Sequence, residues 1–235
     1  MFGQFAATTQ FFLYGKKHFT RTGWEAARAL YPQPDALPAY ELAGKTYMVT
    51  GANQGIGYEI AKYLASRGGT VFMVCRNAAR AEAARDKIVE ETQVDTARVK
   101  CLIADCGVEA DVRCMWDEFA QAQQQGAGNG GGLGLNGLIC NAGALFNEKT
   151  LTPQGLETTF ASHLLWGSYL MTKLALPHLK KATDPRVVLV SSGGMLNTNF
   201  PKWEVATSQE GDYDGNLAYG AQSSATTHLD SERCV

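Results

Sequence analysis

The chain has 235 residues, of which 45% are hydrophobic and 19% are charged, a balance typical of a globular domain and unlike that of disordered or collagenous chains. The 21 Lys and Arg residues against 23 Asp and Glu residues give a net charge of −2. The overall charge therefore indicates neither nucleic acid nor an anionic membrane as a partner. Six cysteines without a C-x-x-C pair or a zinc-like Cys/His spacing favour reduced thiols and no metal site, so the cytoplasm is the favoured compartment.

Residues 1–44 are expected to form an N-terminal extension. Lys16, Lys17 and Arg21 lie here, and residues 1–24 contain no acid. Mitochondrial transit peptides and helices that lie on membrane surfaces share this composition, and a helix that packs on its own domain is the alternative. The longest apolar run is too short to span a bilayer, so no transmembrane helix is expected. Prolines near the end of the extension predict an irregular connection to the first strand.

From residue 45 onward, apolar runs alternate with helical stretches. The apolar runs predict five buried strands at 45–50, 70–75, 99–104, 135–140 and 186–191. The stretches between them predict helices at 55–67, 78–92, 108–125 and in the region up to about 181. Continuous apolar strands separated by helices are typical of a parallel sheet covered on both faces. The fold class is therefore α/β, a Rossmann-type doubly wound parallel sheet in three layers, with residues 45–235 as a single domain.

A glycine-rich turn directly follows the first predicted strand. It spans residues 50–57 (TGANQGIG) and opens the first predicted helix, where free N–H groups and the helix dipole face a bound anion. Gly51 permits the tight turn, Gly55 lets the backbone approach a pyrophosphate, and Gly57 allows close contact of helix and strand. A purely structural turn is the alternative. The candidate dinucleotide-binding residues in this turn are Gly51, Asn53, Gln54, Gly55, Ile56 and Gly57.

A second glycine-rich stretch also matches the pattern G-x-G-x-x-G, at Gly126, Gly128 and Gly131. This stretch follows a polar helix and precedes a strand. Phosphate binding needs the opposite order, with the loop after a strand and at the start of a helix. We therefore interpret residues 126–137 as a flexible linker.

Two polar residues follow the next predicted strands. Arg76 lies at the tip of the second strand, where proteins that bind a ribose 2′-hydroxyl carry Asp or Glu. A cation there suits a 2′-phosphate and favours NADP(H) over NAD(H), with a solvated arginine as the alternative. Asp105 follows the third strand. Its carboxylate could accept a hydrogen bond from an adenine amino group or could cap the following helix.

The ordered set of motifs resembles the short-chain dehydrogenase/reductase family. Besides the glycine turn and Asp105, it includes Asn141-Ala142-Gly143 after the fourth strand and Ser191-Ser192 after the fifth. More narrowly, residues 11–27, 75–77, 184–186 and 190–195 look like the dehydrogenase/reductase SDR family member 12 group, and residues 213–219 resemble the approach to the catalytic tyrosine of that group. The resemblance implies hydride transfer between NADP(H) and an unknown small-molecule carbonyl or alcohol. It makes a homo-oligomer a further expectation.

The resemblance also assigns roles to single residues. Ser192 would hold the carbonyl oxygen, and Tyr219 would act as general acid in reduction or as general base in oxidation. Asn141, Ala142 and Gly143 would line the cofactor. A phenol, with a pKa of about 10, is a poor base at neutral pH and needs a neighbouring cation, which the family supplies as a Lys four residues after the Tyr.

This chain departs from the family pattern at several positions. Ser223 lies four residues after Tyr219, and Ser224 takes that place if Gly220 is an insertion, so neither alignment supplies a lysine. His163 stands where the family usually has Asn, with a buried packing histidine as the alternative. Trp166 reads as an extra residue in the same helix. The last strands of the family are expected to be missing. A catalytically inactive nucleotide-binding or interaction module, or a truncated gene product, is the alternative function.

Overall fold

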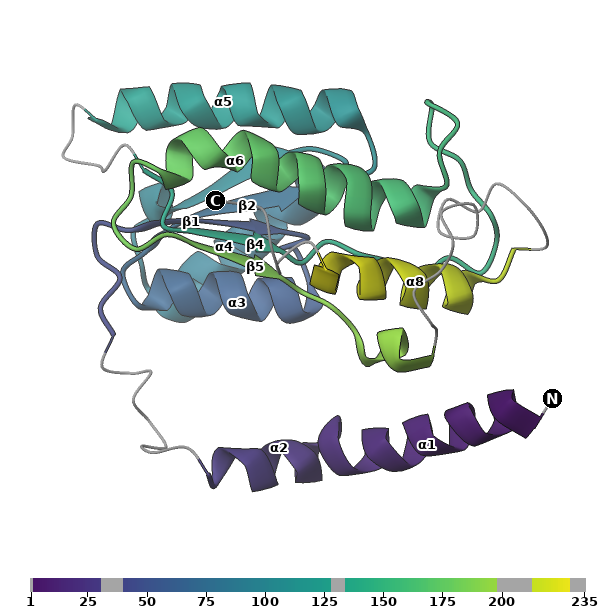
Figure 1. Cartoon of the computed structure of the whole chain (residues 1–235). Helices are drawn as coiled ribbons and strands as arrows, with labels where there is room; N and C mark the ends of the chain where they lie inside the picture. The colour runs from purple at the N-terminus through teal and green to yellow at the C-terminus, as the bar shows by residue number, and fades with distance from the viewer. Residues whose placement is uncertain (1, 31–39, 128–133, 198–212, 229–235) are drawn as a thin grey trace.

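The computed structural model describes residues 2–30, 40–127, 134–197 and 213–228. The described strands form one parallel sheet in the order β3-β2-β1-β4-β5 (Figure 1). They are β1 (Thr46–Thr50), β2 (Thr70–Cys75), β3 (Val99–Ile103), β4 (Gly137–Cys140) and β5 (Arg186–Leu189). All five lie where the apolar runs predict them. The chain runs outward from β1 to β3 and then returns to place β4 beside β1, so the strand order reverses between these two strands.

Helices and short helical turns connect the strands. The α-helices of this domain are α3 (Gly55–Ser66), α4 (Ala78–Thr92), α5 (Glu109–Ala127), α6 (Met171–Leu179) and α8 (Gly215–His228). The other turns are the 3-10 helices η2 (Thr96–Arg98) and η4 (Gly193–Asn197) and the π-helix η3 (Phe160–Leu170). This architecture confirms the predicted Rossmann-type α/β class.

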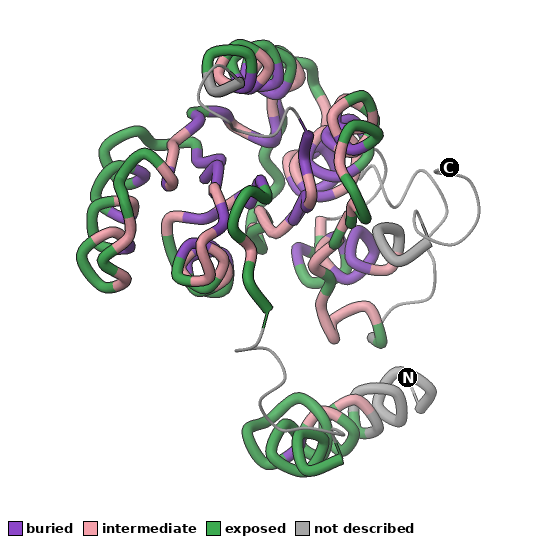
Figure 2. The backbone as a smooth tube through the Cα atoms, turned by 90° about the vertical axis from the view of Figure 1, so that its left-hand side faces the viewer, coloured by how far each residue is buried: buried purple, intermediate pink, exposed green. Residues whose placement is uncertain are grey.

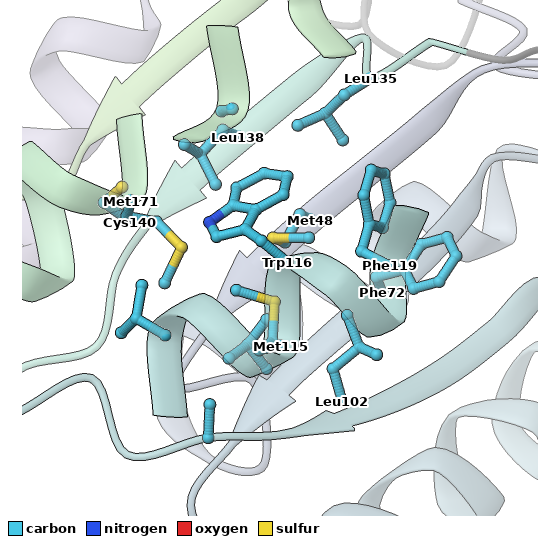
Figure 3. Close-up of a cluster of buried hydrophobic side chains, with 14 of the residues drawn as sticks. Met48, Phe72, Leu102, Met115, Trp116, Phe119, Leu135, Leu138, Cys140 and Met171 are labelled. Atoms are coloured by element: carbon cyan, nitrogen blue, oxygen red, sulfur yellow. The ribbon is translucent and has the colours of Figure 1, made fainter. Parts of the chain in front are cut away.

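The two faces of the sheet bury two separate apolar clusters, because successive strand residues point to opposite faces. On one face, Met48 and Phe72 pack with α5 and α6, and Phe119 meets Phe72 edge-on at 4.8 Å between ring centroids (Figure 3). On the other face, Val49 and Met73 pack with α3 and α4. Figure 2 shows the buried positions concentrated along the strands and on the helix faces toward them. Three layers result, as predicted.

Small residues form the buried face of α3. The helical spacing of Ile56, Ile60, Tyr63 and Leu64 indicates a helix here, and the structure has one. The face toward the sheet, however, carries Gly57, Tyr58, Ala61 and Ala65. Ile56 is 66% exposed. Alanine and glycine let the helix approach the strands closely, and the larger aliphatic residues lie toward its edges and toward solvent.

The long helical region before β5 begins as the π-helix η3. In a π-helix the hydrogen bonds span five residues rather than four, so each turn accommodates more residues. Ser168 reaches back five residues, and its Oγ donates to the carbonyl oxygen of His163. Trp166, which reads as an extra residue in the sequence, lies inside this segment.

The N-terminal extension contains two helices, α1 (Phe2–His18) and α2 (Arg21–Arg28). Figure 1 shows them as an almost continuous rod, on the side of the sheet opposite to α5 and α6. A Cβ on Gly23 would lie 2.3 Å from the carbonyl oxygen of Lys17, so a glycine is needed where α2 meets the end of α1. The prolines before β1 lie outside the described residues. In the described part of the chain, no helix is long and apolar enough to cross a membrane.

Candidate dinucleotide site and catalytic residues

Gly51 and Gly57 hold the turn after β1 in a tight shape. Gly51 has a φ of +67°, in the left-handed region that favours glycine, and its N–H donates to the Val74 carbonyl at 2.8 Å. A Cβ on Gly57 would lie only 2.5 Å from both the Gly51 oxygen and the Asn141 Nδ2 atom. Helix α3 therefore reaches β1 and β4 this closely only because residue 57 has no side chain.

Gly55 plays a different part in the same turn. Its φ is +58°, and no atom lies within 4 Å of the position that a Cβ would take. The N-cap residue of α3, Gln54, makes no side-chain cap to the first turn of that helix. The first N–H groups of α3 therefore lack the usual side-chain acceptor at an open surface, which is the arrangement that binds phosphate.

Thr50 joins this turn to the segment after β4. Its Oγ1 accepts the N–H groups of Asn141 and Ala142, each at 2.9 Å. The Asn141 side chain donates from Nδ2 to the Thr50 carbonyl at 3.0 Å. Thr50 is fully buried. The structure thus brings Asn141 and Ala142 against the glycine turn, where strand order reverses, and Thr50 is a site residue that the sequence analysis did not single out.

Arg76 extends from the same edge of the sheet. In the β1–β2 register Thr50 pairs with Val74, so Arg76, two residues after Val74 and just after the end of β2, lies beside the start of the glycine turn. Arg76 is exposed, and within the described ranges no carboxylate forms an ion pair with it. Asn77 caps α4 by accepting the Arg80 N–H at 2.9 Å. The guanidinium of Arg76 is therefore available to an anionic ligand.

Asp105 follows β3 and shapes the turn before α5. Its Oδ1 accepts the Gly107 N–H at 2.8 Å, and its own N–H donates to Asp111 Oδ2 at 3.0 Å. Ala104 donates to the Cys75 carbonyl at 3.0 Å, which holds this turn beside the end of β2. One carboxylate oxygen of Asp105 thus has a structural partner. The second oxygen has no hydrogen-bond partner among the described residues.

Ser192 and Tyr219 both lie beside Gly194. The Ser192 Oγ accepts the Gly194 N–H at 3.2 Å. A Cβ built on Gly194 would lie 3.5 Å from this oxygen and 3.6 Å from Cδ1 of Tyr219. The hydroxyl of Ser191 donates to the carbonyl of Ser223 at 2.9 Å, which ties the end of β5 to α8 one turn after Tyr219. The fold therefore gathers both predicted catalytic residues beside one glycine.

His163 lies between Tyr219 and the segment after β4. Its Nε2 accepts the Ala144 N–H at 2.7 Å, so the ring carries its proton on Nδ1. The ring lies edge-on to Tyr219, with centroids 5.3 Å apart. Burial lowers the pKa of His163 to about 4. The imidazole is thus neutral near pH 7 and does not supply the cation that the family places beside its tyrosine. The serine four residues after Tyr219 is also buried and uncharged.

A buried carboxylate connects the approach to α8 with the start of η3. Glu157 is only 1% exposed. Its two oxygens accept the N–H groups of Thr159 and Phe160, each at 2.8 Å, and Tyr213 donates its hydroxyl to Oε1 at 3.3 Å. Glu157 thereby holds the helix that carries His163 and the segment that leads to Tyr219. The sequence analysis did not single it out, because an acid in a loop has no distinctive pattern.

Gly126, the described glycine of the second G-x-G-x-x-G match, does not open a helix. Helix α5 continues through Gly126, so this glycine ends a helix instead of opening one. Gly128 and Gly131 lie outside the described residues. Helix N-termini, and not C-termini, present N–H groups to phosphates. Within the parts of the chain that are described, no group of His, Cys, Asp and Glu side chains could hold a metal ion.

Fold and site together define a dinucleotide-binding α/β domain, with a glycine turn at the point where strand order reverses. The family model described as short chain dehydrogenase matches residues 45–204. The chain therefore belongs to the short-chain dehydrogenase/reductase family. The relatives in this family share oxidoreductase chemistry with a nicotinamide dinucleotide.

Among curated proteins, the chain is 37% identical over 212 residues to dehydrogenase/reductase SDR family member 12 of Bos taurus, covering 88% of this chain and 61% of the relative. It is 34% identical over 192 residues to the human WW domain-containing oxidoreductase, covering 79% of this chain and 43% of that protein. The chain therefore spans about three fifths or less of the length of these relatives.

Two solved structures are also similar. An uncharacterised protein from Mycobacterium paratuberculosis matches with a TM-score of 0.65 at 30% identity, covering 80% of this chain and 62% of that one. A short chain dehydrogenase from Escherichia coli CFT073, complexed with NADPH, matches with a TM-score of 0.56 at 26% identity, covering 80% of this chain and 69% of that one. Both likenesses agree with the assigned family.

Proposed function

We propose that this chain binds NADP(H) and transfers a hydride between it and a small-molecule carbonyl or alcohol. The observation that carries the proposal is that Ser192 and Tyr219 both lie beside Gly194. These two residues lie 27 positions apart in the sequence, and α8 packs on η4 to bring them together. A hydroxyl that holds a carbonyl oxygen and a phenol that transfers a proton need this proximity.

The residues around the glycine turn fit a dinucleotide. The open side of Gly55 and the uncapped start of α3 would receive the pyrophosphate, and Asn141, Ala142 and Gly143 would border the cofactor. Asp105 has an oxygen to accept a hydrogen bond from an adenine amino group. When bound, the nicotinamide would supply or accept the hydride. The complex of the similar E. coli dehydrogenase with NADPH adds support for this class of ligand.

Arg76 supports a preference for NADP(H) over NAD(H). Its guanidinium lies beside the glycine turn without a carboxylate partner in the described chain. An acid at the tip of β2 would accept from a ribose 2′-hydroxyl and repel a 2′-phosphate, whereas an arginine attracts the phosphate. We therefore expect NADPH to bind more tightly than NADH.

In the proposed reduction, the Ser192 hydroxyl donates a hydrogen bond to the carbonyl oxygen and the Tyr219 hydroxyl gives that oxygen a proton. In oxidation, Tyr219 takes the proton from the alcohol. His163 packs on the Tyr219 ring as a neutral group, so it orients the phenol without adding charge. Because Ser223 takes the place of the family lysine, we expect slow turnover.

The test is NADPH consumption by the purified chain with a panel of aldehydes and ketones. Tyr219→Phe and Ser192→Ala should each abolish turnover, while Tyr169→Phe, a change at a 48% exposed tyrosine, should leave it unchanged. Ser223→Lys should raise the rate, because a cation one turn from Tyr219 favours proton transfer from the phenol. Turnover that survives Tyr219→Phe would overturn the catalytic assignment. Binding of NADPH without any turnover would instead indicate an inactive nucleotide-binding protein.

We also propose a reducing, cytoplasmic location and a homo-oligomer. The described cysteines are all free, and burial raises the pKa of Cys75 to about 11 and that of Cys106 to about 12. Ile56 on α3 and Val188 on the edge strand β5 are exposed apolar side chains that a second copy could cover. Size-exclusion chromatography with light scattering tests the assembly, and a strict monomer at all concentrations would contradict it.

A further inference from the structure

The N-terminal helices carry exposed apolar side chains, and α1 contacts the domain at η4. Phe12 and Leu13 of α1 are 68% and 67% exposed, and Trp24 of α2 is 52% exposed. Figure 2 shows α1 and α2 exposed along almost all of their described length. Large exposed apolar patches in soluble proteins mark interaction surfaces. The exposed apolar residues of α1 and α2 therefore indicate a binding partner.

The docked side is identified by its contacts. Phe11, Gly15 and Phe19 recur at intervals of four, which places them on one face of the helix and its continuation. Phe19 meets the domain at Gly193, where a Cβ would lie 2.6 Å from its ring. At 100° per residue, Leu13 is on the opposite side of α1 from Phe11. Leu13 therefore points away from the domain, and Phe12, which is one residue from Phe11 and 68% exposed, lies to the side of the docked face.

Cations accompany the exposed apolar residues at a fixed spacing. Lys16 follows Phe12 and Lys17 follows Leu13 by four residues, so each lysine lies one turn beyond an apolar side chain on the same face. In α2, Arg28 follows Trp24 by four residues and its guanidinium lies 5.2 Å from the indole ring. Long basic side chains can extend to charged headgroups while the apolar side chains next to them insert below.

The extension is electrically distinct from the rest of the chain. Residues 1–30 contain four Lys and Arg residues and one acid, a charge of +3, so the rest carries −5 of the total −2. The single acid, Glu25, is paired with Arg21 at 2.8 Å. A local basic surface of this kind is attracted to an anionic membrane, although the whole chain is slightly acidic.

We propose that α1 and α2 bind the surface of an anionic phospholipid bilayer. The two helices lie along the membrane plane, Phe12, Leu13 and Trp24 enter the headgroup boundary, and Lys16 and Lys17 contact the lipid phosphates. An anionic bilayer as the partner accounts for both the aromatic residues and the positive charge. A second copy of the chain would account for the apolar face but does not require the cations next to it. The domain itself stays in water, with its sheet above the helices.

The test is flotation of the full chain with vesicles of phosphatidylcholine containing about 30% phosphatidylserine, against vesicles of phosphatidylcholine alone. The wild-type chain should float with the first and much less with the second. Lys16→Glu combined with Lys17→Glu should weaken binding at least about 25-fold, because each basic residue near a charged surface contributes about fivefold. About 1 M salt should release the chain, since it shortens the screening length to about 3 Å.

A matched control separates this surface from net charge. Lys180→Glu combined with Lys181→Glu makes the same charge change at two exposed residues after α6, across the sheet from α1, and should leave binding within about twofold, because electrostatic attraction falls off within a Debye length. Wild-type emission should shift to the blue with vesicles, and Trp24→Phe should remove that shift. The proposal is overturned if the wild-type chain does not float, or if the control pair loses as much binding as the Lys16 and Lys17 pair. It is also overturned if the chain self-associates in a concentration-dependent way that the Lys16 and Lys17 changes abolish. None of these readouts depends on oxidoreductase activity.

Discussion

The imidazole of His163 lies edge-on to the phenol of Tyr219, with the ring planes at 81° and the centroids 5.3 Å apart. The same imidazole accepts the Ala144 N–H through Nε2. One side chain thus fixes both the loop after β4 and the ring that we place at the centre of proton transfer. The Nε2 atom can accept the Ala144 N–H only while the ring is neutral, and this has a measurable consequence.

We predict that protonation of His163 destabilises the protein as the pH falls. Burial lowers its pKa from 6.5 to about 4, so between these values the unfolded chain binds more protons than the folded one. Stability is then complete above about pH 6.5 and declines as the pH falls toward 4, by about 3 kcal/mol in total. Urea unfolding across this pH range measures the effect.

The matched comparison is His163→Asn, which should lose that part of the pH dependence. The two proteins share all other titratable groups, so the difference between the two curves isolates the histidine. Identical curves for wild type and variant between pH 4 and 6.5 would show that His163 is not the buried neutral group described here.

A second prediction concerns the hydroxyl of Thr50, which accepts two backbone N–H groups. Thr50→Val keeps the shape and leaves both donors without an acceptor, so we expect a loss of about 2 to 4 kcal/mol in the free energy of unfolding. Thr50→Ser retains the hydroxyl and should lose less than half as much. A valine variant as stable as wild type would mean that these two hydrogen bonds are not formed.

The two glycines that flank Ile56 should respond differently to alanine. Gly57→Ala places a Cβ 2.5 Å from backbone and side-chain atoms, and we expect a loss of about 3 kcal/mol or more in stability. Gly55→Ala meets no atom, so only its left-handed backbone costs about 1 to 2 kcal/mol. Thermal melts of both variants make the comparison, and a reversed order would contradict the tight packing of α3 on β4.

The sheet and its order of helices could be predicted from the sequence, because buried parallel strands leave long apolar runs and each run ends at a turn or glycine. The glycine turn could be predicted for the same reason, since it stands between a strand and a helix. The buried face of α3 could not be predicted, because the small residues that face the sheet carry less hydrophobic signal than Ile56. Thr50 accepts two backbone N–H groups that are distant in sequence, and Glu157 accepts the hydroxyl of the distant Tyr213, so no local pattern identifies these partners.

His163 is a position where the structure shows more than the family resemblance predicts. The family pattern marks its position, but only the structure shows the hydrogen bond to Ala144 and the burial that keep the ring neutral. Ser192 and Tyr219 could be named from the family motifs. Their shared position beside Gly194 depends on the packing of α8 against η4, which lies beyond sequence spacing.

We propose that the turn from Gly51 to Gly57, together with Arg76, binds NADP(H). Fluorescence titration of the full chain with NADPH and with NADH tests this binding most directly. We expect saturable binding with NADPH at least about tenfold tighter, since a charge-assisted contact contributes about 1.5 to 3 kcal/mol, and Arg76→Ala should remove that preference while NADH binding persists. Absence of saturable binding by either nucleotide to a chain that melts cooperatively would contradict the proposed dinucleotide site.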